Sequence, residues 1–276
     1  MGITSECLFI QPGMEHNGIP HPGGCIIAEA MRRSFHFAMI TAMWFLALAT
    51  ALTSARYFLV PPRFLVPTEI LALSRHHLLI LLHIACGILA VTVGLFQFVS
   101  SLRDAYPRVH RAGGYLYLSA VFLAGCAGLL LSTDTPVFAA HALTDLTAID
   151  LSRLGLAPAF LGYSASSKFS PHQFFFVMVG FGTLALVWLF TAAVAFARAR
   201  QLRFDEHRAW MMRSYSLTFA AATVRLAALP LLVLTRDPVV AITCTFWSWI
   251  LNLVVAEWFI RRSPVGAPTR LAQTAS

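Results

Sequence analysis

The chain has 276 residues, of which 58% are hydrophobic and only 12% are charged, and its mean hydropathy is +0.72. Soluble domains average about a quarter charged residues, so this composition excludes an ordinary soluble protein. The formal net charge of +8 does not indicate nucleic-acid binding, because the basic residues cluster at the ends of apolar segments and form no continuous basic surface with interleaved aromatic residues.

Long apolar segments follow one another along the chain. A helix of about 20 apolar residues crosses the hydrocarbon layer of a membrane, and uninterrupted apolar runs exclude the alternating pattern of a β-barrel. We therefore predict an all-α, polytopic membrane protein. Its six predicted transmembrane helices are, in chain order, Phe35–Ala55, His77–Val99, Ala112–Ser132, His172–Ala197, Trp210–Leu234 and Val239–Ile260.

The distribution of Lys and Arg predicts the orientation of these helices. Most of the 20 Lys and Arg residues lie on the side that also holds both ends of the chain, and an excess of basic residues marks the cytoplasmic side. Residues 1–34 and 263–276 are therefore predicted cytoplasmic tails, and 35–262 the six-helix domain.

Met31 is an alternative translation start, and the segment after it also fits a signal peptide. We expect a retained helix, because cleavage would break the charge asymmetry.

The link between the third and fourth predicted helices, Thr133–Pro171, is long and is predicted to face outward. Within it, residues 147–162 have the apolar spacing of a helix that lies on the membrane surface. This link fits a lid or a docking site for a partner, and it fits a plain covering loop equally well.

A histidine–arginine pair occurs twice at the start of an apolar segment, as His110–Arg111 and as His207–Arg208, each shortly after a Leu-Arg pair. The second and third predicted helices thereby parallel the fourth and fifth. Two such hairpins side by side form a four-helix core with a pseudo-twofold axis. This core is predicted to bring His83 towards His172 near the outer face, and His110 towards His207 near the inner face.

Facing histidines on antiparallel helices are typical axial ligands of a b-type haem. Gly87 and Gly94 lie on the same helical stripe as His83 and would leave room for a porphyrin. Guanidinium groups bind carboxylates in bidentate fashion, so four arginines are candidate partners of the haem propionates. These are Arg111, Arg208, Arg213 and Arg225. Two haems near opposite faces would carry electrons across the membrane between a quinol, or another small reductant, and an acceptor.

Three other interpretations fit the same residues. In the plainest, basic side chains at helix ends reach lipid headgroups, and glycines allow close helix packing. In the second, the protein is a small-molecule or proton-linked transporter whose cavity is lined by Arg225, Asn252 and Glu257, because ionisable groups inside a span are usually functional. Glu257 also fits a simple structural ion pair with Arg213. In the third, the protein is an assembly subunit of a larger membrane complex, docking through its outer link and its Trp-rich last helix.

No motif of a zinc protease, a phosphate-binding loop or a serine hydrolase occurs in the sequence, so no catalytic residue is assigned. The five cysteines are scattered without a C-x-x-C pair, which argues against a zinc site or a disulfide framework.

Four blocks of the sequence resemble the bacterial predicted membrane protein family "domain of unknown function 2306". They are "HIACGILAVTVGLFQF", "LRDAYPRVHRAGGYLYL", "EHRAWMMRSYSLTFAAATVRL" and "WSWILNLVVAE". The resemblance covers roughly His77 to Glu257 and implies a multi-span protein of the bacterial inner membrane, without supplying an activity. The Thr133–Pro171 link is longer than the family pattern usually allows. The histidine layout is also similar, in arrangement and not in motif, to the ascorbate-reducible transmembrane cytochromes b.

Overall fold

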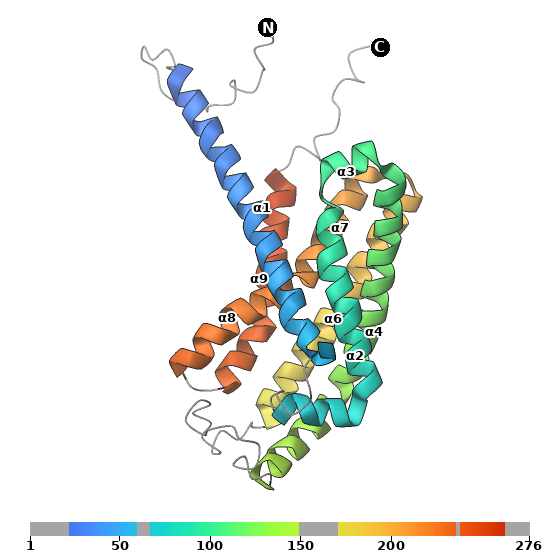
Figure 1. The fold of residues 1–276 in the computed structure, drawn as a ribbon, viewed down its shortest axis with the longest axis vertical. Helices are drawn as coiled ribbons and strands as arrows, with labels where there is room; N and C mark the ends of the chain where they lie inside the picture. The colour runs from blue at the N-terminus through green and yellow to red at the C-terminus, as the bar shows by residue number, and fades with distance from the viewer. Residues whose placement is uncertain (1–21, 60–66, 149–170, 236–237, 263–276) are drawn as a thin grey trace. The chain divides into compact units, whose positions relative to one another are not determined.

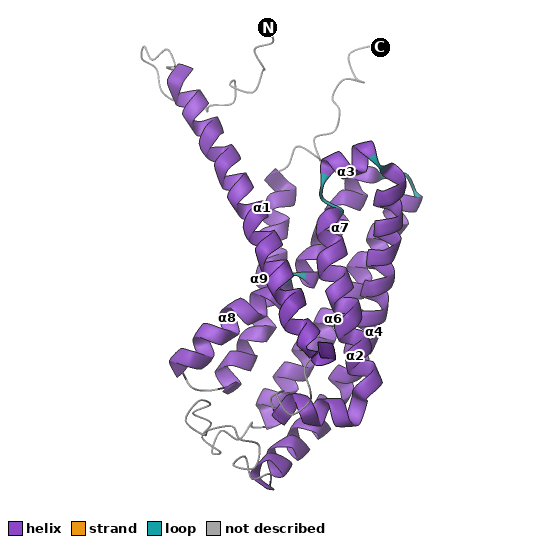
Figure 2. Ribbon diagram, viewed as in Figure 1, coloured by secondary structure: helices purple, strands orange, loops and turns teal. Residues whose placement is uncertain are grey.

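The computed structural model describes residues 22–59, 67–148, 171–235 and 238–262, with only the backbone described for some residues near helix ends. These residues form helices joined by short turns, and no strand occurs among them (Figure 2). The prediction of an all-α fold is therefore confirmed. The helices are α1 (Pro22–Leu59), α2 (Pro67–Phe96), α3 (Ser100–Ala105), α4 (Pro107–Ala148), α6 (Pro171–Arg200), α7 (Phe204–Thr218), α8 (Ala220–Thr235) and α9 (Pro238–Arg262) (Figure 1).

Proline marks the start of most of these helices. α1, α2, α4, α6 and α9 each begin with a proline. The first residue of a helix has no partner for its N–H group, and the proline ring already fixes φ near the helical value. Proline therefore suits the first position of these five helices.

Four helices in the described part of the chain are long and apolar enough to cross a membrane. They are Phe37–Leu59, His76–Phe96, Pro107–Thr133 and Met178–Arg200, and they correspond to the first four predicted spans. α9 nearly coincides with the sixth predicted span, but neither the fifth nor the sixth is among these four. The count of six, the inner membrane and the cytoplasmic position of both termini stay predictions.

The predicted fifth span, Trp210–Leu234, is not one uninterrupted helix. α7 ends at Thr218, and α8 begins at Ala220 and continues in a different direction (Figure 1). The Ser216 and Thr218 hydroxyls donate to carbonyls of the preceding turn at 2.8 and 3.1 Å, and such bonds bend helices. In addition, Asn252 of α9 donates to the Ser216 carbonyl at 3.1 Å, which gives this carbonyl a partner outside α7.

Several helices extend beyond the spans predicted for them. The third membrane span ends at Thr133, next to the predicted Ser132, but α4 itself continues to Ala148, so the long outer link begins as a helix. The rest of the link, with most of the predicted surface helix at 147–162, lies outside the described residues. The first membrane span begins at Phe37, close to the predicted Phe35, but α1 itself begins at Pro22. α2 begins at Pro67, before the predicted start at His77, and bends at His76, whose φ of −127° and ψ of 42° are not helical.

The chain divides into two compact units, residues 1–46 and residues 47–276, and α1 belongs in part to each. In the second unit α2 packs on α4, α4 on α6 and α6 on α7, while α7 also contacts α2. α9 packs against α6, α7 and α8. These contacts form the predicted four-helix core, although the internal repeat of two hairpins stays a prediction.

Alanines make up most of the buried apolar residues described in this unit, and many large apolar side chains are exposed. Ala90, Ala124 and Ala195 are completely buried, whereas Leu78 and Phe122 are 82% and 61% exposed. A soluble helical bundle has the opposite arrangement, because it buries its large apolar residues. Small residues at helix contacts and large apolar residues outside are typical of helices that pack within a membrane and contact its lipids.

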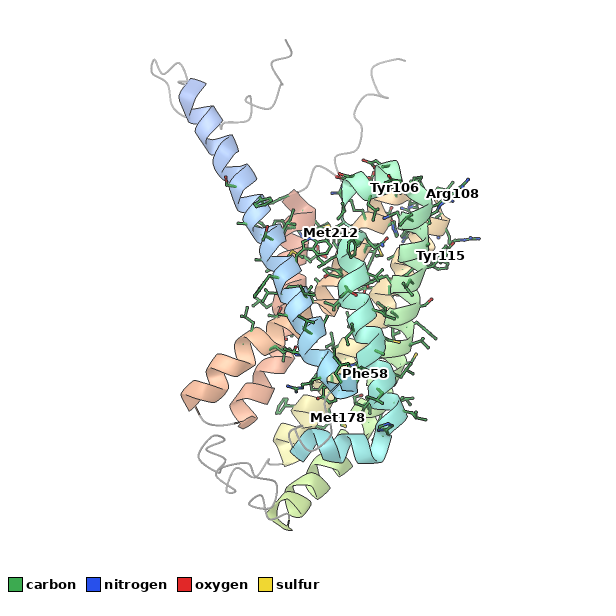
Figure 3. All side chains as sticks on the ribbon, in the orientation of Figure 1. Phe58, Tyr106, Arg108, Tyr115, Met178 and Met212 are labelled. Atoms are coloured by element: carbon green, nitrogen blue, oxygen red, sulfur yellow. The ribbon has the colours of Figure 1, made fainter. Side chains whose placement is uncertain are left out.

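Arginines gather at one end of the bundle, which we call the arginine-rich end. It comprises α3, the start of α4, the end of α6 and the start of α7, and its arginines are Arg103, Arg108, Arg111, Arg198, Arg200, Arg203 and Arg208. Figure 3 shows Tyr106 and Arg108 at this end and Phe58 and Met178 near the opposite end. Glu206 forms ion pairs with Arg203 and, at 3.0 Å, with Arg198.

Candidate functional site in a cavity between the helices

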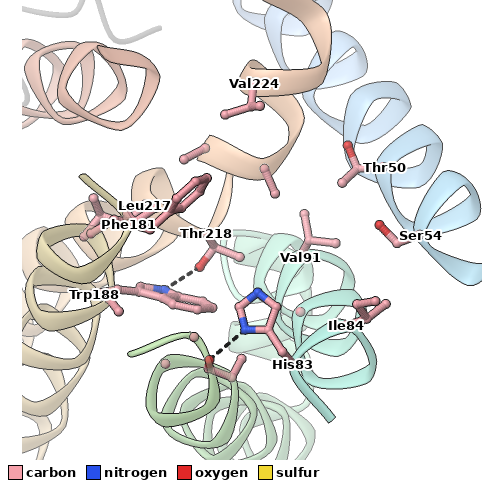
Figure 4. Close-up of a pocket in the computed structure, with 18 of the residues that line it drawn as sticks. Thr50, Ser54, His83, Ile84, Val91, Phe181, Trp188, Leu217, Thr218 and Val224 are labelled. Carbon is pink, nitrogen blue, oxygen red and sulfur yellow. Dashed lines mark hydrogen bonds between the residues drawn. The ribbon is translucent and has the colours of Figure 1, made fainter. Parts of the chain in front are cut away.

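A cavity of about 380 Å³ lies between α2, α4, α6 and the junction of α7 with α8, and Thr50 and Ser54 of α1 also line it (Figure 4). Its volume is at the low end of the range of about 300–1,000 Å³ that small-molecule sites occupy. Most of the lining is apolar, from Ile84 and Val91 on α2 to Leu217 and Val224 near the α7–α8 junction. The polar lining residues are Thr50, Ser54, His83, Ser132, Trp188, Thr218 and Arg225.

Glycines and alanines create this space. A Cβ atom built on Gly87 would meet nothing within 4 Å, so α2 faces open space at this position. Ala124 and Gly125 on α4 and Ala220 and Ala221 at the start of α8 line other sides of the cavity. Because none of these residues has a long side chain, the helices approach one another and still leave a void.

His83 directs one ring nitrogen into the cavity. Its Nδ1 atom lies 2.8 Å from the carbonyl oxygen of Ala124. A carbonyl only accepts hydrogen bonds, so Nδ1 carries the hydrogen, and in the neutral ring Nε2 carries the lone pair. Figure 4 shows Nε2 on the side of the ring that faces the cavity. Gly128 makes room for this ring, because a Cβ at Gly128 would lie 3.1 Å from Cε1 of His83.

Arg225 of α8 contributes a positive charge to the cavity wall. Its Nη1 atom donates to the Ala221 carbonyl at 2.8 Å, and its Nη2 atom donates to the Ser54 hydroxyl at 3.0 Å. The guanidinium lies close enough to His83 to act electrostatically on the imidazole. Arg225 is the ionisable residue predicted to lie within the fifth span. The structure places it on the cavity wall, where the change of direction after Thr218 brings α8.

A buried hydrogen-bond chain borders the cavity. The Tyr117 hydroxyl lies 2.9 Å from the Ser214 hydroxyl and 3.0 Å from that of Thr218, and Trp188 Nε1 donates to Thr218 at 2.9 Å. Thr218 donates its own hydrogen to the Ser214 carbonyl. It must therefore accept from Tyr117, and Ser214 must donate to Tyr117. Every hydroxyl hydrogen in this chain has one acceptor, and the chain ties α4, α6 and α7 together.

His83 and His172 do not lie at the same height along the axis of the bundle. His83 contacts α4 at Gly128, and the neighbouring contacts between α4 and α6 join Ser132 to Gly182 and Gly125 to Leu189. The level of Gly128 therefore corresponds to about residue 186 of α6. His172, near the start of α6, is about 20 Å away along the helix axis. The side chain of His172 itself lies outside the described residues.

His110 and His207 do lie at the same end of the bundle. Nδ1 of His207 donates to the Ala195 carbonyl at 2.8 Å, which leaves the lone pair of the neutral ring on Nε2. Nδ1 of His110 is buried and has no hydrogen-bond partner. The two imidazoles are close enough to interact electrostatically. This is the one predicted histidine pair that the described residues bring together.

The remaining predicted residues lie away from the cavity. Arg213 binds Glu257 at 2.5 Å and stacks over the Trp210 ring, so the predicted structural ion pair is present. Asn252 accepts from Thr223 at 3.1 Å and donates to the Ser216 carbonyl, and it stabilises the α7–α8 junction. Neither Asn252 nor Glu257 lines this cavity, whereas Arg225, the third residue of the predicted transport cavity, does.

Arg111 and Arg208, the other candidate propionate partners, are exposed at the arginine-rich end. Arg111 donates from Nε to the Pro107 carbonyl at 3.4 Å. Within the described part of the chain, no group of three or more His, Cys, Asp or Glu residues is placed to hold a metal ion.

Sequence reasoning missed the hydroxyl and indole groups that border the cavity, among them Ser54, Trp188 and Thr218. The sequence does contain one indication of the Thr218 hydroxyl. Residues 213–218, "RSYSLT", place polar side chains in an otherwise apolar segment, and such a run predicts a helix that is bent or faces a polar partner. Ser54 and Trp188 carry no comparable signal, because single Ser and Trp residues are common in membrane helices.

Comparisons with known proteins supply a family and no activity. The sequence model of a family described as "Predicted membrane protein (DUF2306)" matches residues 80–165 and 155–260, which together form more than half of the chain. No curated protein and no solved structure matches the chain, and the predicted similarity to cytochromes b gains no support from these comparisons. The resemblance stated from the four sequence blocks is confirmed: the chain belongs to the predicted membrane protein family DUF2306.

Proposed function

We propose that this protein is a membrane carrier that binds a small amphipathic molecule in the cavity between α2, α4, α6 and the α7–α8 junction. The observation that carries the proposal is the interruption at Phe219, after which Arg225 and the first turn of α8 line the cavity. Interrupted helices are tolerated in membranes where they are buried or line a cavity, and in transporters they form the substrate site.

The chemistry of the wall supports an amphipathic ligand. Aliphatic and aromatic side chains make up most of the lining and would contact an apolar body. Ser54, His83 and Arg225 provide hydroxyl, imidazole and guanidinium groups for a polar head. Sites of this kind combine a mainly apolar surface with a few polar groups that orient the ligand.

Photolabelling tests this proposal. Methyl 4-benzoylbenzoate, a neutral probe that inserts into C–H bonds on illumination, is added to the purified protein in lipid nanodiscs, and labelled residues are mapped by mass spectrometry. We expect labels in residues 84–91 and 124–128. Gly87→Phe should remove these labels because its ring fills the cavity, whereas Gly87→Ala should retain them. Labels confined to outward residues such as Phe122, with no effect of Gly87→Phe, would refute the proposal.

A second candidate function, electron transfer through a b-type haem, is favoured by His110 and His207 at the arginine-rich end. His207 has its hydrogen fixed on Nδ1, as metal-bound histidines usually do, and Nδ1 of His110 is buried without a partner. These two residues would hold the haem, and the haem would supply one-electron chemistry. The corresponding outer site does not fit, because no second histidine is among the residues lining the cavity at His83 and about 20 Å of helix separates its level from His172.

A reduced-minus-oxidised absorption spectrum of the purified protein tests the second candidate. The expected result is a Soret band that sharpens on reduction and is lost in His207→Ala. His77→Ala, which changes an exposed histidine on α2, serves as the control and should leave the spectrum unchanged. A protein purified without porphyrin absorption after expression with ample haem would exclude this function.

A further inference from the structure

Resting on the proposed function, we infer that the ligand of the cavity is a small carboxylic acid with an apolar body, whose carboxyl group binds between Arg225 and His83. The two side chains come from different helices, α8 and α2, and both line the same cavity.

Arg225 favours a carboxylate over other polar heads. The planar guanidinium matches a planar carboxylate and can donate two parallel hydrogen bonds to it. The bonds from Arg225 to the Ala221 carbonyl and the Ser54 hydroxyl hold the guanidinium in place before a ligand arrives. A ligand with a positive head would be repelled, and a doubly charged phosphate would lose more hydration energy on entering a membrane cavity.

His83 adds a specific requirement, a hydrogen-bond donor on the ligand. Nε2 of the neutral ring can only accept, because the hydrogen is held on Nδ1 by the Ala124 carbonyl. A protonated carboxyl group meets both demands at once. Its O–H group donates to Nε2 of His83, and its carbonyl oxygen accepts from Arg225. An ester has no donor for His83, and an alcohol has no second oxygen for Arg225.

The same geometry permits proton transfer from the acid to His83. The O–H bond breaks, an N–H bond forms at Nε2, and the carboxylate is then held between an imidazolium and a guanidinium. His83 bonds the Ala124 carbonyl on α4, and the other polar side chains that line the cavity are Thr50 and Ser54 on α1, Ser132 on α4, Trp188 on α6, Thr218 on α7 and Arg225 on α8. Among the described residues that line the cavity, Arg225 is the one with a fixed charge.

The experiment compares 4-benzoylbenzoate with its methyl ester, two photoprobes that differ only at the carboxyl group. In nanodiscs containing the wild-type protein, half-maximal labelling of residues 84–91 and 124–128 should need at least tenfold less acid than ester. Arg225→Gln should raise the acid concentration required at least tenfold and leave the ester unchanged. His83→Asn, which keeps a donor for the Ala124 carbonyl but lacks Nε2, should weaken labelling by the acid at least threefold and not labelling by the ester.

Ester labelling of the cavity also reports whether each variant is folded, and Arg262→Gln, at an exposed arginine of α9, is the matched control for loss of a positive charge. Equal half-maximal concentrations of acid and ester in the wild type, or an acid response that Arg225→Gln does not change, would overturn the inference while the cavity proposal stands. Failure of both probes to label the cavity would overturn the proposed function, and the inference with it.

Discussion

Two glycines of α2, Gly87 and Gly94, lie on the same stripe of the helix, two turns apart, and have opposite surroundings. A Cβ at Gly87 would meet nothing within 4 Å, whereas a Cβ at Gly94 would lie 2.5 Å from the Tyr215 ring and 2.9 Å from the Tyr117 ring. A glycine stripe therefore does not distinguish close packing from room for a ligand. The residues that the opposing helices supply decide between the two.

The region around Gly94, which we call the tyrosine layer, consists of Gly94, Tyr117, Tyr215 and the Thr218 hydroxyl that bonds Tyr117. The two rings lie 6.4 Å apart between centroids, and the Tyr215 hydroxyl donates to the Val91 carbonyl of α2 at 3.0 Å. Tyr117 is completely buried. The tyrosine layer thus joins α2, α4 and α7 firmly, next to a cavity that the same three helices leave open. Thr218 belongs to both regions, since it bonds Tyr117 and lines the cavity.

The largest expected effect is at Thr218, the residue that the two regions share. Thr218→Val keeps the shape but leaves the Trp188 N–H and the Tyr117 O–H without their acceptor. Buried donors left unsatisfied cost about 1–3 kcal/mol each, so for two donors we expect a loss of about 2–6 kcal/mol in the free energy of unfolding. Unfolding by SDS titration measures it. Thr218→Ser retains the hydroxyl and should lose less than half as much; equal losses would show that packing of the methyl group is what matters.

An effect of intermediate size is expected in the tyrosine layer. Gly94→Ala places a methyl group against both tyrosine rings, which must move. Overpacking of this kind typically costs about 1–3 kcal/mol, so the melting temperature in detergent should fall. If Gly94→Ala were as stable as the wild type, the rings would have room to shift, and the contrast between the two glycines would disappear.

The smallest effect, with the opposite sign, is expected at the cavity. Gly87→Ala adds a methyl group in open space and removes the entropic cost of a glycine in a helix. We expect a gain of about 0.5–1 kcal/mol in the free energy of unfolding, measured by the same SDS titration. Gly128→Ala is the comparison on the other cavity wall, and it should not be stabilising because its Cβ would lie 3.1 Å from the His83 ring. A destabilised Gly87→Ala would contradict an open cavity at α2.

Much of the architecture follows from the sequence because its causes are local. Apolar runs of sufficient length predict α2, α4 and α6 as spans. The prolines that begin these helices precede the predicted starts at His77, Ala112 and His172. The pair of Arg213 with Glu257 was also predictable, since two opposite charges near the ends of adjacent antiparallel helices are expected to meet. These inferences need only the number of residues between features along a helix.

The tertiary structure alone decided the site. The sequence placed His83 opposite His172, but the register of α6 against α4 sets His83 level with about residue 186 instead. The sequence does not show whether Gly87 or Gly94 faces a void. It also does not show that the break at Phe219 directs α8 and Arg225 to the cavity. Sequence determines the helical period and the apolar runs of the spans, whereas the sliding and rotation of one helix against another depend on the fit of many side chains at once. A displacement of one turn, about 5.4 Å, is enough to exchange one facing residue for another.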